Sequence, residues 1–163
     1  MFSIQYFVYG IRYTVYDWIF SMKNRALTKD LPEKIGEAVV IAGWVDIRRD
    51  HGKLIFLDVR DRSGTIQVVV TPKAAEALEI AKRLRPQWVV AIEGAVTKRP
   101  ETMQTEGKLG RIEVVAENIG VLSEAQELPF DLSAELNLDT YLDYLPLTLR
   151  TERTRDIFIM QGT

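Results

Sequence analysis

The sequence predicts a mostly β protein with one helix, built as a five-stranded Greek-key barrel of the OB-fold class with terminal extensions. Five short segments rich in β-branched and aromatic residues alternate with turn signals, which is typical of strands in a small barrel. A helix-patterned stretch separates the third segment from the fourth, as in the OB-fold. The composition, 47% hydrophobic and 27% charged over 163 residues, is that of a soluble globular protein. A generic β-barrel or sandwich of this size is the alternative.

The first half of the barrel is predicted from three β-patterned segments that follow a short polar turn at residues 28–36. The expected strands are residues 39–47, 54–61 and 65–71, joined by a charged turn at residues 48–53 and a tight turn at residues 62–64. Gly43 lies inside the first strand, and a glycine there indicates a bulge or bend of the kind that a small barrel requires.

The second half begins with a helix. Apolar residues recur at spacings of three and four over residues 73–85, which places them on one face of an amphipathic helix that Pro86 terminates. Two further strands are expected at residues 88–98, with Gly94 inside, and at residues 110–122. A polar loop at residues 99–109 joins them.

The two ends of the chain differ from this pattern. Residues 1–21 hold eight of the fifteen aromatic residues, but Arg12 and Asp17 interrupt the apolar run that a membrane span needs. This stretch is either an extension that packs on another surface or translated sequence upstream of a start at Met22. The predicted parts are an aromatic-rich extension (1–22), a barrel domain (23–122), a hinge or linker (123–150) and a helix start (151–163) with nowhere evident to bury its apolar patch.

The residues present exclude most enzymatic sites. The chain has no cysteine and one histidine, and it lacks the phosphate-binding glycine loops, the nucleophile elbow and the zinc-protease motif. We interpret the acids Asp58 and Asp61 as solvated turn residues. No catalytic residue and no metal ligand is predicted, and this chain alone is not expected to be an enzyme.

The predicted hairpin of the second and third strands favours nucleic-acid binding. Alternation places Ile55, Leu57 and Val59 in the core and leaves Phe56 on the open face, and in the next strand it turns Gln67 outward. An exposed aromatic ring offers unpaired bases a stacking platform, and arginines bind phosphate. The cations available are Arg48, Arg49, Lys53, Arg60 and Arg62, in a chain of net charge −2. The alternative is a core Phe56 beside a solvated charged face.

A longer motif carries a specific resemblance. The run from Gly43 to Val69, GWVDIRRDHGKLIFLDVRDRSGTIQVV, closely resembles the anticodon-binding domain of bacterial-type aspartyl-tRNA synthetases. Weaker matches follow at residues 93–100, 110–114 and 142–150, the last with Leu145 where an arginine is usual. The resemblance covers residues 24–161 and leaves the aromatic leader outside it.

This resemblance implies roles for particular side chains. It implies that Phe56 stacks on the central anticodon base, a uridine, and that Gln67 hydrogen-bonds the same base. It also implies an anticodon contact for Arg49, and for Glu113 a contact with the first base, where a carboxylate accepts from the donors of a guanine edge.

Further positions carry weaker implications. Arg99 matches a basic residue near the anticodon stem, and His51 lies at the position beside the third base, where histidine resembles family members that accept both aspartate and asparagine tRNAs. We predict that Arg48, Lys53 and Arg60 form a secondary basic face.

The resemblance also implies what surrounds this module. The family's class II catalytic domain, which uses ATP and magnesium, would begin near Thr151, so residues 151–163 resemble its truncated start and the chain itself is expected to need no cofactor. The expected partner is tRNA, in the cytoplasm and away from membranes, with a homodimer expected for the full-length parent. The chain is either a fragment or a stand-alone anticodon-binding protein. The alternatives are a sequence-tolerant single-strand binder and a protein-interaction module that docks through its two ends.

Overall fold

The computed structural model describes residues 22–107, 109–130, 136–149, 154, 157 and 160–161. The chain divides into two compact units, Met1–Ala125 and Gln126–Thr163. The predicted aromatic leader at residues 1–21 and the proposed helix start at Thr151 lie outside the described residues.

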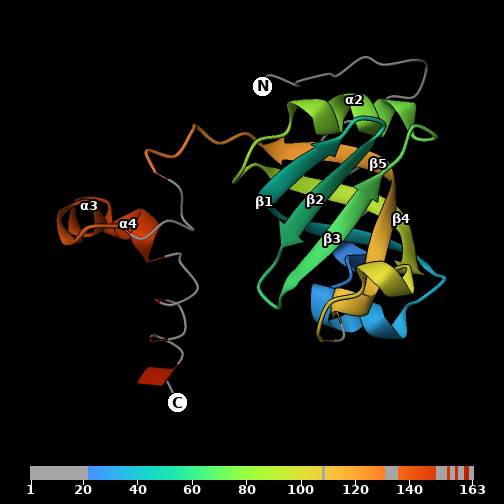
Figure 1. Cartoon of the computed structure of the whole chain (residues 1–163), viewed down its shortest axis with the longest axis horizontal. Helices are drawn as coiled ribbons and strands as arrows, with labels where there is room; N and C mark the ends of the chain where they lie inside the picture. Colours follow the sequence, from blue (N-terminus) through green and yellow to red (C-terminus); the bar gives the residue numbers. More distant parts are fainter. Residues whose placement is uncertain are drawn as a thin grey trace. The chain divides into compact units, whose positions relative to one another are not determined.

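Five strands of the first unit close into a barrel in the order β1-β2-β3-β5-β4 (Figure 1). The strands are β1 (Ala38–His51), β2 (Leu54–Arg60), β3 (Thr65–Val70), β4 (Val89–Lys98) and β5 (Ile112–Ser123). Neighbouring strands are antiparallel except β3 and β5, which run parallel. Helix α2 (Ala75–Arg83) lies between β3 and β4 in the chain. The predicted OB-fold order is therefore confirmed.

Strand β1 is longer than predicted. The charged turn expected at residues 48–53 is wrong for its first four residues, because these continue β1 to His51 and pair with β2. The turn shrinks to Gly52 and Lys53, where Gly52 has φ +75°, a backbone conformation that favours glycine. The prediction ends β1 too early because it assigns the charged residues to a turn. Pairing with a neighbouring strand can continue a strand through polar residues.

Two glycines allow the barrel strands to approach closely. A Cβ built on Gly43 would lie 2.3 Å from the carbonyl oxygen of Arg60, and one on Gly94 would lie 2.2 Å from that of Val115. The register shift of β1 falls between Val45 and Ile47 rather than at Gly43, whereas the shift of β4 against β5 does fall at Gly94. Gly43 therefore serves close packing, and the bulge that the sequence suggested lies a few residues further on.

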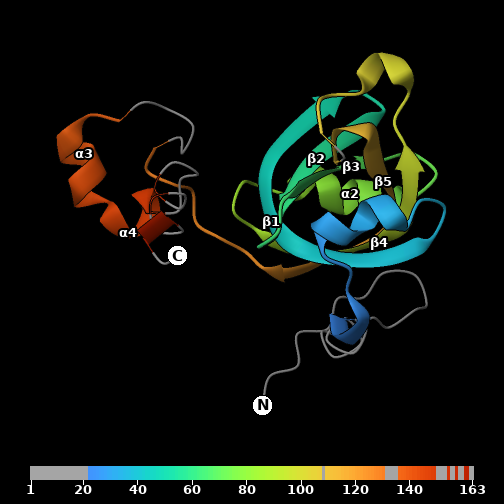
Figure 2. The same cartoon turned by 90° about the horizontal axis from the view of Figure 1, so that it is seen from below.

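Alternating side chains fill the barrel interior, and short helical elements close its two ends. Helix α2 covers one end with Ala77 and Ala81, while Leu31 of the 3₁₀ helix η2 (Thr28–Glu33) enters the core from the other end (Figures 1 and 2). The remaining 3₁₀ turns are η1 (Met22–Asn24), η3 (Glu101–Met103) and η4 (Leu109–Arg111). Burying this apolar surface is the main favourable term in folding.

Asp61 ties η2 to the turn between β2 and β3. Its carboxylate accepts from Thr28 N at 2.8 Å, Thr28 Oγ1 at 2.9 Å, Ser63 N at 2.6 Å, Ser63 Oγ at 2.7 Å and Gly64 N at 3.1 Å. Burial raises the pKa of Asp61, but the hydrogen bonds from Thr28 and Ser63 outweigh it and hold the pKa below its ordinary value. The interpretation of Asp61 as a solvated turn residue is therefore wrong.

The described part of the second unit includes the short helices α3 (Leu138–Asp143) and α4 (Leu145–Thr148). Asn137 caps α3 by accepting a 2.8 Å hydrogen bond from the backbone N–H of Thr140. The Thr148 hydroxyl donates to the carbonyl of Tyr141 at 3.0 Å, which holds the two helices together. No helix in the described part of the chain has the length and apolar character of a membrane span.

Replacing Asp61 by Asn should lower the free energy of unfolding by about 1–3 kcal/mol at neutral pH, because a buried charged acceptor is lost. The ordinary pKa of an aspartate is 3.8. With the folded-state pKa below that value, the contribution of the carboxylate is complete above it and is lost as the pH falls through the folded-state pKa. The gap between wild type and D61N, measured by urea unfolding, should therefore shrink on acidification. The exposed Glu33→Gln is the control, and a gap that persists in acid contradicts this account.

Candidate nucleic-acid interface

The side chains of β2 alternate between the barrel core and the outer surface. Ile55, Leu57 and Val59 are at most 1% exposed, whereas Phe56 and Asp58 between them are partly exposed. The closed barrel forces this alternation, because the inward side chains pack against one another. The predicted outward position of Phe56 is therefore correct.

Arg49 and His51 of the neighbouring strand lie beside Phe56. Arg49 lies directly opposite Phe56 in the β1–β2 ladder, and its Nη2 pairs with Asp58 Oδ1 at 2.7 Å. The ring of His51 meets Phe56 edge-on, with ring centroids 5.4 Å apart and an interplanar angle of 90°. This contact fixes the orientation of the two rings relative to each other. Arg49, His51 and Phe56 therefore form one group at the turn end of the β1–β2 hairpin.

A second group lies on β3 and β5. Gln67 Nε2 donates to Glu113 Oε2 at 3.4 Å, and Arg99 Nε lies 4.0 Å from the same oxygen. Arg99 also donates to the Ile112 carbonyl at 3.0 Å, which anchors its guanidinium beside the strand. The parallel pairing of β3 with β5 places Gln67 and Glu113 side by side although 46 residues separate them in the chain.

The surroundings of Glu113 shift its ionisation. Burial raises the pKa of this carboxyl above its ordinary value, and the guanidinium of Arg99 partly opposes the shift. When the folded-state pKa of a glutamate is raised, its protonated form stabilises the folded state. This contribution to the free energy of unfolding is complete below the unfolded-state pKa and is lost as the pH rises through the folded-state pKa. The raised pKa therefore means that the ionised Glu113 carboxylate costs some stability near neutral pH.

The strand register joins the two groups into a continuous surface, which we call the open face: Arg49, His51, Phe56, Gln67, Arg99 and Glu113. Gln67 lies opposite Asp58, the residue that pairs with Arg49. An aromatic ring, two guanidiniums, an amide and a carboxylate thus lie along one side of four strands. Such a set can stack on a flat ligand, bind phosphate and hydrogen-bond base edges.

The residues predicted as a secondary basic face lie apart. Arg48 donates from Nη1 to the Lys82 carbonyl of α2 at 2.9 Å. Arg60 donates from Nε to both carboxylate oxygens of Asp46 at 3.0 and 2.9 Å, and its guanidinium lies 5.8 Å from the centre of the Trp44 ring. Lys53 is exposed in the β1–β2 turn. Arg48, Lys53 and Arg60 therefore do not form a single basic face, and the predicted secondary face is not present as one surface.

Sequence reasoning did not assign a role to two residues that hold arginine side chains on the barrel surface, Asp58 and Trp44. Asp58 was expected to be a solvated turn residue, but it lies in β2 with 20% of its side chain exposed and holds the guanidinium of Arg49. Trp44 is 41% exposed on β1 under Arg60. The alternation of β2 could have identified Asp58, because it falls on the same side as Phe56. Within the described residues no three acids or histidines gather as a metal site.

The comparisons with known proteins agree with this geometry. Residues 39–122 match a tRNA anticodon family model described as an OB-fold nucleic acid binding domain. The chain belongs to this family. The match runs from β1 to β5 of this nucleic-acid-binding domain and includes every residue of the open face.

Relatives of this OB-fold domain are tRNA ligases. The chain is 46% identical over 125 residues to an aspartate–tRNA(Asp/Asn) ligase of Rubrobacter xylanophilus, which covers 75% of this chain and 21% of the relative. It is 45% identical over 126 residues to an aspartate–tRNA ligase of Geobacillus kaustophilus, with 74% and 21% covered. An asparaginyl-tRNA synthetase structure from Pyrococcus horikoshii superposes with a TM-score of 0.72 at 30% identity, covering 85% of this chain and 32% of that one. The chain thus spans about a fifth of the length of these curated relatives.

Replacing Arg99 by Gln should raise the pKa of Glu113 further, because the guanidinium that favours the carboxylate is removed. The titration of the Glu113 carboxyl can be followed by carbon-detected NMR in the wild type and in R99Q. The neighbouring exposed Lys98→Gln removes the same charge and should leave the titration nearly unchanged. Equal shifts in the two variants would show that the local pair does not control this group.

Proposed function

We propose that this domain binds the anticodon loop of an aspartate-type tRNA through its open face. The observation that carries the proposal is the outward position of Phe56, an aromatic side chain left partly uncovered next to Arg49 on a nucleic-acid-binding barrel. The names of the ligases related to this chain support the choice of tRNA.

The physical basis is stacking with local charge neutralisation. An unpaired base that lies against Phe56 gains about 1–3 kcal/mol from stacking. The Arg49 guanidinium is held by Asp58 through one contact at 2.7 Å, and its other N–H groups remain available to a phosphate or a base edge. A bound phosphate therefore finds a cation that is already oriented.

Gln67 and Glu113 are suited to reading bases. An amide that donates one N–H to Glu113 keeps a second N–H and its carbonyl oxygen, a donor and an acceptor that match one edge of uracil. The Glu113 carboxylate accepts hydrogen bonds, and guanine presents donors to such a group. We therefore assign the central uridine to Phe56 and Gln67 and the first base to Glu113, with His51 beside the third base and Arg99 toward the stem.

The wider assignments belong to the same proposal. The full-length parent would be an aspartate–tRNA ligase that works as a cytoplasmic homodimer and uses ATP and magnesium in its catalytic domain, and it would act on tRNA(Asp) and, given His51, also on tRNA(Asn). The 163 residues themselves would bind tRNA without a cofactor and without catalysing aminoacylation, since they carry none of the enzymatic motifs sought in the sequence.

Replacing Phe56 by Ala should weaken binding of an anticodon stem-loop RNA by about 1–3 kcal/mol, because the stacking surface is removed. Fluorescence anisotropy at one fixed salt concentration measures the loss. The matched variant Phe56→Leu keeps apolar bulk on β2 without a flat ring and should lose most of the same affinity. If F56A lowers thermal stability but binds RNA as tightly as the wild type, the stacking role is wrong.

Replacing Gln67 by Ala should reduce discrimination at the central base by about 1–2 kcal/mol, because the hydrogen bonds to uracil are lost. The measurement compares stem-loops that carry uridine or cytidine at that position. Exposed Thr65→Ala on the same strand is the control. Equal losses for every anticodon variant, or equal binding of unstructured DNA by the wild type, would favour a sequence-tolerant single-strand binder.

A further inference from the structure

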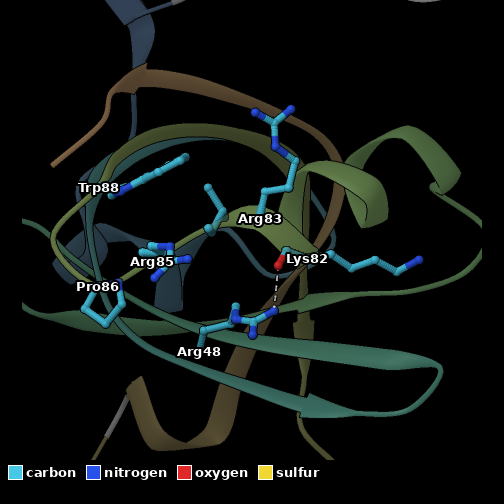
Figure 3. A pocket seen from close by; sticks show the side chains of 7 residues that line it. Arg48, Lys82, Arg83, Arg85, Pro86 and Trp88 are labelled. Carbon is cyan, nitrogen blue, oxygen red and sulfur yellow. Dashed lines mark hydrogen bonds between the residues drawn. The ribbon is translucent and has the colours of Figure 1, made fainter. Parts of the chain in front are cut away.

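A second, strongly basic site lies at the C-terminal end of α2. A pocket of about 610 Å³ opens there (Figure 3). Its lining residues are Arg48, Lys82, Arg83, Leu84, Arg85, Pro86 and Trp88. A volume of this size is in the range of small-ligand sites.

Fixed apolar and backbone contacts shape the walls of this pocket. Trp88 is 8% exposed and donates from Nε1 to the Ala125 carbonyl at 3.0 Å, which holds the indole in place. Leu84, which also lines the pocket, is 2% exposed. On the opposite wall Arg48 is held against α2 by its 2.9 Å hydrogen bond to the Lys82 carbonyl, the dashed line in Figure 3. These contacts fix the positions of two side chains on opposite walls of the pocket.

The charge of the pocket is one-sided. Four of its seven lining residues are cations and none is an acid, in a chain whose net charge is −2. Lys82 pairs with Glu79 at 2.6 Å, and its ammonium extends away from the other labelled cations in Figure 3. Arg83 and Arg85 are exposed, and neither takes part in an ion pair with any other residue of the described chain.

Stabilising the end of α2 does not account for all of these cations. Basic side chains near a helix C-terminus interact favourably with its free carbonyls. Arg48 already occupies the Lys82 carbonyl, and Arg85 lies beyond the last helical residue. Arg48, Arg83 and Arg85 line one pocket that has no acid among its lining residues, and the resulting local positive potential favours a bound anion.

The pocket adjoins the open face across the edge of one strand. Arg48 and Arg49 are neighbours on β1 and point to opposite sides, Arg49 toward Phe56 and Arg48 toward α2. Val45 exchanges backbone hydrogen bonds with Gln87 and Trp88, so the loop that carries Arg85 reaches β1 at this point. Beyond that contact, no described strand pairs with the outer edge of β1.

We propose that this pocket binds the phosphodiester backbone of the RNA that occupies the open face, with Arg48, Arg83 and Arg85 contacting phosphates that flank the anticodon. The inference rests on the proposed function, since it takes the same RNA as ligand. An RNA strand that extends from the base on Phe56 would cross the unpaired edge of β1 and reach Arg48, Arg83 and Arg85. A planar guanidinium can bind two phosphate oxygens at once through two of its N–H groups. These contacts add affinity and carry no base information.

The test compares the full chain with the double variant R83E/R85E, using an anticodon stem-loop RNA titrated at several salt concentrations. We expect affinity to fall about tenfold or more and the slope of log K against log salt to become shallower by about 1–2, because phosphate contacts are lost. The preference for uridine over cytidine at the central base should stay at the wild-type ratio. The variant K29E/K73E changes net charge equally at exposed lysines outside the pocket and should affect the slope far less.

A charge-retaining variant separates electrostatics from misfolding. R83K/R85K should keep most of the wild-type slope and unfold near the wild-type temperature, because the charge is retained and the two side chains are exposed. R83E/R85E places an acid in the last turn of α2 and should unfold slightly below the wild-type temperature while staying folded in the binding assay. If R83E/R85E has the wild-type slope, or behaves like K29E/K73E, the pocket does not bind the backbone and the proposal is overturned. A loss of the uridine preference in the wild type would instead contradict the proposed function, whatever the slopes show.

Discussion

Closure of a five-stranded sheet around a dry interior is the constraint on which the rest of this structure depends. A barrel of this size is filled by its own inward side chains, so most strand positions alternate between the core and the outside. In β2 the inner places go to Ile55, Leu57 and Val59, and this leaves Phe56 outside although its ring is as apolar as theirs. The candidate stacking platform is thus a direct consequence of barrel packing.

The cations of the barrel differ in how they are held. On the open face Arg49 is paired with Asp58, and Arg99 lies against Glu113, so these guanidiniums are oriented but partly neutralised. Such pairs favour specific geometry over net attraction, because a phosphate must compete with a carboxylate already in place. In the pocket beside α2, Arg83 and Arg85 have no such partner in the described chain. This division explains how an acidic chain can carry one surface suited to base recognition and another suited to backbone attraction.

Local pattern predicted the elements well and the polar contacts poorly. Strand order, the helix after β3 and the outward positions of Phe56 and Gln67 follow from periods of two and of three to four residues, which adjacent residues determine. The burial of Asp61 depends on Thr28, 33 residues earlier, and the orientation of Gln67 depends on Glu113, 46 residues later. No local pattern contains such pairs, so an acid that anchors the fold was interpreted as a solvated turn residue.

The sequence by itself therefore determined the fold class and which side of each strand faces the core, because these depend on side-chain chemistry at fixed spacing. The tertiary structure alone decided that β1 runs on to His51, that Arg48 turns away from Arg49 to meet α2, and that its guanidinium shares a pocket with Arg85. These outcomes depend on strand register and on where the chain returns after α2. Both are set by barrel closure, which joins residues far apart in the chain.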